Sequence, residues 1–142
     1  MADLALVTAG VMHVVDANPH SQITTVANAA LVAGQICSLV AATGKAQLAD
    51  ADVETLAGQL WMATRNCAAG EAITLSRDCV VAGFDLSSIN PGGVAVYLSN
   101  TAGAMADAAA SPGTSIVVGR TMPVFANGAT ADRLLHFCPS NT

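Results

Sequence analysis

The chain of 142 residues has little charge: only 11% of its residues are Asp, Glu, Lys or Arg, against about 25% in ordinary globular proteins. It contains one lysine and four arginines, which are scattered along the sequence. Nucleic-acid binding needs clustered cations that neutralise phosphates, so we exclude nucleic acid as a partner. No apolar run reaches the ~18 residues of a membrane-spanning helix, so we expect no membrane association.

Large side chains are also scarce, because aromatic residues make up 4% of the chain while 29 residues are alanine. A surface with so little charge is poorly suited to a free monomer, since charge maintains solubility. The composition therefore favours a domain that is partly covered by copies of itself or by another protein. An alanine-rich monomeric β domain is the alternative. The apolar start of the chain lacks a basic segment, which argues against a secretory signal and indicates synthesis in a cytoplasm.

Sequence motifs for catalysis are missing. The chain has no GxGxxG, no phosphate-binding loop and no GxSxG. Its four cysteines form no CxxC pair, and we expect them to be small buried side chains, with a disulfide as the alternative. His136 and Cys138 would share one strand face as a possible nucleophile pair. The competing interpretation places Leu135 and Phe137 in the core and His136 at the rim, and we prefer it.

Acidic residues cluster once, at Asp50, Asp52 and Glu54. This spacing is compatible with a weak calcium-like site, but a solvated loop explains it better. We therefore predict no catalytic residues, no cofactor and no metal site.

Short apolar runs separated by turns every 8–12 residues predict an all-β sandwich or barrel-like domain of short strands. One such domain is expected over residues 23–142, after a distinct segment at 1–22. The strand pattern also predicts an approximate internal duplication, with copies at 31–86 and 90–138. Gly58 and Gly119 are paired in this alignment, as are Gly70 and Gly128. A loose self-match of a turn-rich β chain is the alternative.

The first 22 residues are apolar until Pro19 interrupts them, because proline withholds a ladder hydrogen bond. They are interpreted either as an N-terminal arm that docks on a neighbouring subunit or as an ordinary edge strand. The arm interpretation predicts that removing residues 1–20 weakens partner binding more than folding. Its candidate interface residues are Leu4, Leu6, Val7, Val11, Val14 and Pro19.

Several segments, in a conserved order along most of the chain, resemble the decoration (cement) proteins of tailed-phage capsids. They are the opening Met1–Leu6, the Ala29–Gln35 approach to a strand, the Thr43-Gly44-Lys45 turn reaching Asp52, the strand Gly58–Ala63, and the segments Ala68–Leu75 and Gly93–Gly103. Cys37 and Leu60-Trp61-Met62 depart from the family pattern, which affects the expected packing of those strands.

The resemblance implies a structural virion protein on the outer surface of an assembled icosahedral capsid. Such proteins bridge neighbouring copies of the major capsid protein, often as homotrimers, and stabilise the shell. Two alternatives stay open. One is a head-fibre base or glycan-binding β module, which would need exposed aromatic rings such as Trp61 or Tyr97. The other is a small hydrolase that uses Cys138 or Cys67, which would require an activated thiol.

Overall fold

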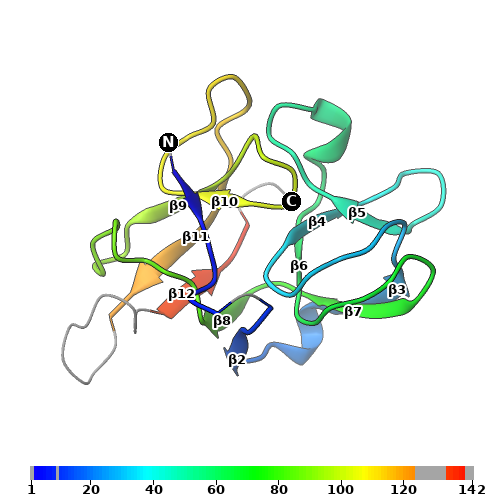
Figure 1. The fold of residues 1–142 in the computed structure, drawn as a ribbon, viewed down its shortest axis with the longest axis horizontal. Coiled ribbons are helices and arrows are strands. Elements are labelled where there is room, and N and C mark those ends of the chain that lie inside the picture. Colours follow the sequence, from blue (N-terminus) through cyan, green and yellow to red (C-terminus); the bar gives the residue numbers. More distant parts are fainter. Residues whose placement is uncertain (1, 9, 124–133, 140–142) are drawn as a thin grey trace.

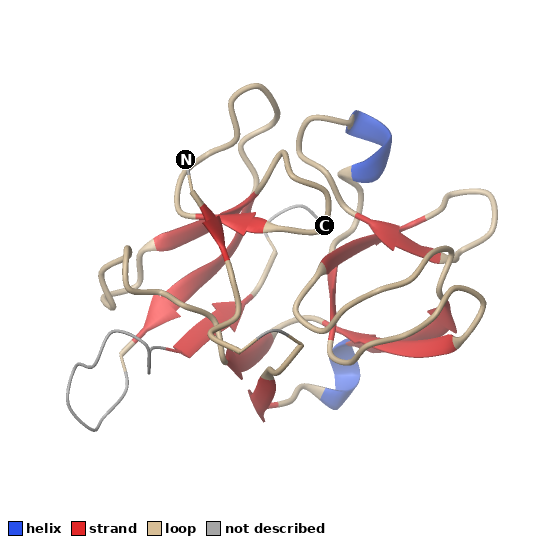
Figure 2. Cartoon of the chain, viewed as in Figure 1, coloured by secondary structure: helices blue, strands red, loops and turns tan. Residues whose placement is uncertain are grey.

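The computed structural model describes all residues except 1, 9, 124–133 and 140–142, and Glu54 only by its backbone. The described residues form two antiparallel sheets, and their helices are two 3-10 turns, η1 (Pro19–Ser21) and η2 (Glu54–Leu56). Figure 2 shows strands and loops in nearly the whole chain. The predicted all-β, sandwich-like fold class is confirmed.

The first sheet has five strands, seen on the right of Figure 1. Its order is β3 (Gln22–Val26), β7 (Ala72–Ser76), β6 (Trp61–Ala63), β4 (Ile36–Leu39) and β5 (Ala46–Leu48). The second sheet has seven strands, in the order β1 (Asp3–Leu4), β10 (Met105–Ala106), β9 (Ala95–Leu98), β11 (Val117–Met122), β12 (Leu134–Phe137), β8 (Cys79–Ala82) and β2 (His13–Asp16).

The main core combines side chains from both sheets. It includes Ile36 and Met62 from the first sheet and Val96, Leu135 and Phe137 from the second, all fully buried. Side chains alternate between the two faces of a strand, so Leu135 and Phe137 point inward while His136 between them is half-buried. The preferred interpretation of this segment, with Leu135 and Phe137 in the core, is therefore confirmed.

A second, smaller core lies within the first sheet and contains Trp61, Ile73 and Leu75. A parallel bridge between Ala27, just after β3, and Ala46 in β5 brings the two edge strands of this sheet together. The first sheet therefore curls around its own core. Burial of Trp61, with 5% of its surface exposed, agrees with the prediction that its ring belongs to the core.

The two sheets share one strand order. The order β3-β7-β6-β4-β5 in the first sheet corresponds to β8-β12-β11-β9-β10 in the second. The register matches as well: Leu39 pairs with Ala46, and the residues 59 positions later, Leu98 and Met105, also pair.

These matching units run over 22–76 and 79–137. The predicted copies, 31–86 and 90–138, instead placed β8 at the end of the first unit. In the matched registers Gly119 stands opposite Val96 where Trp61 stands opposite Cys37, so its counterpart is Trp61 rather than Gly58. Gly128 lies outside the described residues. Duplication of the sequence itself stays a prediction.

The N-terminal segment supplies both outer strands of the second sheet. β1 pairs with β10 at one edge, and β2 pairs with β8 at the other. Between them, Leu6 bridges to Phe84, and the Val7 amide donates to the Gly83 carbonyl at 2.8 Å. The segment thus lies along its own domain in this structure, as the edge-strand interpretation expects (Figure 1).

Candidate functional site: an apolar N-terminal surface

The six predicted interface residues have different environments. Leu4 is buried in the main core, and Leu6 is half-buried against it. Leu4 therefore contributes to folding of its own domain and offers no exposed surface. Val7, Val11, Val14 and Pro19 are exposed, so these four lie where a partner can reach them.

Exposed valines concentrate in this segment. Of the eight exposed large hydrophobic residues described, four belong to residues 7–15: Val7, Val11, Val14 and Val15. We call these four residues the valine surface. Val15, with 56% of its surface exposed, was missed by sequence reasoning because strand alternation assigns it to the face opposite Val14. The β2–β8 register shifts between Val14 and Asp16, so Val15 is an extra residue in the strand.

β2 is also an outer strand, and all four of its residues are exposed. An edge strand presents backbone donors and acceptors to whatever approaches it. Apolar side chains together with an open backbone edge are the features by which proteins bind a strand or a flat protein surface. This arrangement can therefore support protein binding without any catalytic group.

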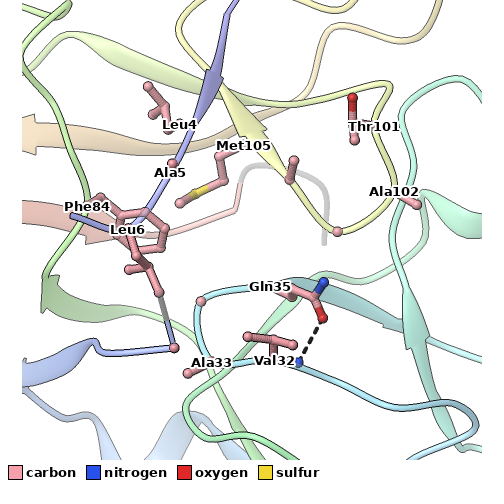
Figure 3. Close-up of a pocket in the computed structure, with 14 residues that line it drawn as sticks. Leu4, Ala5, Leu6, Val32, Ala33, Gln35, Phe84, Thr101, Ala102 and Met105 are labelled. Carbon is pink, nitrogen blue, oxygen red and sulfur yellow. Dashed lines mark hydrogen bonds between the residues drawn. The ribbon is translucent and has the colours of Figure 1, made fainter. Parts of the chain in front are cut away.

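A cavity of about 390 Å³ lies beside the valine surface (Figure 3). Leu4, Leu6, Phe84 and Met105 line one side of it, and the loop at 32–35 lines the other. None of the lining residues that the structure describes is an acid, a base or a thiol. The Gln35 side-chain oxygen accepts from the Val32 amide at 2.8 Å, which holds that loop. The cavity suits apolar groups and cannot perform acid–base chemistry.

A second cavity, of about 370 Å³, brings His136 and Cys138 together with Arg120. The structure thus confirms that His136 and Cys138 share one face. A hydrogen bond with Asp78 is the main cause that raises the pKa of Cys138, and burial and the Asp78 charge add to it. A thiol with a raised pKa is protonated at neutral pH and is a weak nucleophile.

The other cysteines are buried, so three of the four fit the expected environment. Burial raises the pKa of Cys37 to about 12 and is the main cause that raises the pKa of Cys79 to about 11. Cys67 is also buried, and all four cysteines are free thiols. These environments argue against the hydrolase alternative, whose nucleophile requires a lowered pKa.

The acidic cluster forms a turn in the structure, because the Asp50 carboxylate accepts from the Asp52 amide at 2.9 Å. Among the described residues, no group of three or more metal-ligating side chains comes together. No helix in the described part of the chain has the length and apolarity to cross a membrane. Trp61 is buried and Tyr97 half-buried, so neither offers the exposed ring that the glycan-binding alternative needs.

Comparison with known proteins adds no family assignment. No protein-family model, no curated protein and no solved structure significantly matches this chain.

Proposed function

We propose that the protein is a structural virion component that binds the outer surface of an assembled tailed-phage capsid. In this function it stabilises the shell by bridging neighbouring copies of the major capsid protein, and it acts as a homotrimer. Binding to the assembled shell but not to its separate subunits stabilises assembly by mass action.

The observation that best supports this proposal is the valine surface on the outer strand β2. Four exposed apolar side chains within nine residues are unusual in a chain whose core is otherwise complete. Exposed apolar groups of this kind mark protein contact sites. The resemblance of the strand and turn segments to capsid decoration proteins identifies the partner as a capsid shell.

The test is density-gradient fractionation of a phage lysate, probed with an antiserum to this chain. We expect the protein to band with full particles in a fixed ratio to the major capsid protein. Recovery only in the soluble fractions would contradict the proposal and leave the binding-module alternative.

A matched pair of variants tests the surface itself. Val14 and Val26 are exposed to a similar extent, 37% and 36%, and both lie in strands. We expect Val14→Asp to reduce shell binding at least tenfold and Val26→Asp to leave it unchanged, with both variants folded by circular dichroism. Equal effects of the two substitutions would show that β2 is not the contact strand.

A further inference from the structure

The contact between the two sheets uses a turn of the second sheet. This turn, residues 99–104, joins β9 to β10 and rests against the first sheet. The Ile36 amide donates to the Gly103 carbonyl at 2.9 Å, and the Gly103 amide donates to the Ala49 carbonyl at 2.7 Å. Gly103 is buried there, and a Cβ atom at its position would lie 2.9 Å from Leu48 Cδ2.

The first sheet has an equivalent turn, which joins β4 to β5. The Val40 amide donates to the Lys45 carbonyl at 2.8 Å, as the Ser99 amide donates to the Ala104 carbonyl at 3.0 Å 59 positions later. Gly44 and Gly103 both have positive φ angles, of 72° and 79°. Residues 41–45 are nevertheless exposed, and a Cβ atom at Gly44 would have no neighbour within 4 Å.

The second sheet also has a counterpart of the surface on which the turn rests. Counting 59 positions from Gln35, Ile36, Leu48 and Ala49 leads to Val94, Ala95, Asp107 and Ala108, which we call the acceptor surface. Val94 is 38% exposed and Ala108 is exposed, while Ala95 and Asp107 are half-buried. The acceptor surface is therefore accessible in a single chain, like the turn at 41–45.

Charge on the two surfaces is complementary. Lys45, the one lysine of the sequence, lies on the exposed turn. Asp107 lies on the acceptor surface, at the position equivalent to Leu48, which packs against Gly103 in the contact within the chain. One Asp107 oxygen accepts from the Ala2 amide at 2.8 Å, and its second oxygen can accept from an ammonium group. Complementary charges favour orientation and specificity in a protein contact.

A twofold relation between the sheets would place each turn on the other sheet, and both turns would be buried. Only the turn at 99–104 is docked, so the relation is head-to-tail, and each chain retains one free turn and one free acceptor surface. Head-to-tail contacts repeat from copy to copy and close into rings where the rotation allows.

We propose that the turn at 41–45 of one copy docks on the acceptor surface of a second copy and repeats between chains the contact made within the chain. The Gly44 amide would then face the Ala108 carbonyl. The Gly44 carbonyl already accepts from the Thr25 hydroxyl at 2.6 Å and has a second lone pair for the Ala95 amide. This contact rests on the self-association within the proposed function but does not require a capsid.

Crosslinking with purified protein tests the contact. In a Cys138→Ser background, Thr43→Cys marks the turn and Ala108→Cys marks the acceptor surface. A short bismaleimide should link the two single variants to each other when they are mixed, and should link neither to itself. The matched control replaces Ala108→Cys with Ala29→Cys, another exposed alanine, and should give no product. Absence of product in the Thr43→Cys and Ala108→Cys mixture, or self-linking of either variant alone, would overturn the proposal.

A charge exchange provides a second test by sedimentation velocity. Lys45→Glu should weaken self-association at least tenfold, and mixing it with Asp107→Lys should restore heterologous pairs. Arg65→Glu removes another exposed cation and should have no effect. Equal weakening by Lys45→Glu and Arg65→Glu would refute the contact. Because no shell is present, failure here leaves shell binding to the lysate experiment.

Discussion

Gly119 provides a stringent test of the packing in the second sheet. A Cβ atom at this position would lie 2.5 Å from the His136 carbonyl oxygen and 3.2 Å from Leu135 Cδ1. Gly119 pairs with Phe137 across the β11–β12 ladder, next to a register shift in the pairing of β11 with β9. Gly119→Ala therefore forces two paired backbones apart. Gly58→Ala is the matched control, because a Cβ atom at Gly58 would meet nothing within 4 Å.

The magnitude follows from the atom that is struck. Overpacking a well-packed site costs about 1–3 kcal/mol, and the contact here is with backbone, which cannot rotate away. Each ladder hydrogen bond weakened between β11 and β12 adds about 1 kcal/mol. We expect Gly119→Ala to lower the free energy of unfolding by about 3 kcal/mol. Gly58→Ala should change it by less than about 1 kcal/mol, in the stabilising direction, because alanine restricts the unfolded chain.

The assay is urea unfolding monitored by far-UV circular dichroism, supported by thermal melting. For a domain of this size, about 3 kcal/mol corresponds to a decrease in melting temperature of roughly 10 °C. The decrease should appear with Gly119→Ala and be absent with Gly58→Ala. If both variants melt within 2 °C of the original protein, the close approach of β11 and β12 is wrong, and with it the register on which the correspondence of the two sheets depends.

The remaining predictions concern the core, the N-terminus and pH. Trp61→Ala should destabilise the domain by about 3–5 kcal/mol, since the buried ring also lies under Arg77, 5.3 Å from its guanidinium carbon; an unchanged melting temperature would show an exposed ring. Deleting residues 1–20 should now lower thermal stability as well as shell binding, because the deletion removes the buried Leu4; equal melting temperatures with and without the segment would restore the detached-arm interpretation. The raised pKa values of Cys37 and Cys79, about 12 and about 11, mean that the unfolded chain loses these protons first. Stability should therefore be complete below pH 9 and decline as pH rises through 11–12, and Cys37→Ala should flatten that decline in urea titrations.

Much of the fold follows from local pattern. Leu135, His136 and Phe137 alternate in polarity, and alternation of this kind specifies a strand with one buried face. Glycine turns such as Thr43-Gly44-Lys45 separate the strands, because glycine adopts positive φ at little cost. These features predicted the all-β class and the buried Trp61 without knowledge of which strands are neighbours.

The candidate site depended on contacts that local pattern does not contain. Leu4 and Val7 belong to one apolar run, yet Leu4 is buried and Val7 is 59% exposed. The difference arises because β1 pairs with β10, about a hundred positions away in the sequence, and covers Leu4 there. Val15 faces solvent because of a register shift against β8, and such a shift depends on the partner strand.

The sequence by itself determined that this protein is an all-β domain of short strands with a low-charge surface, because these properties depend on composition and on neighbours along the chain. The tertiary structure decided the pairing of the N-terminal segment with both outer edges of the second sheet and the different environments of the turns at Gly44 and Gly103. Those outcomes depend on packing between segments far apart in sequence, where a shift of one residue exchanges the buried and exposed faces.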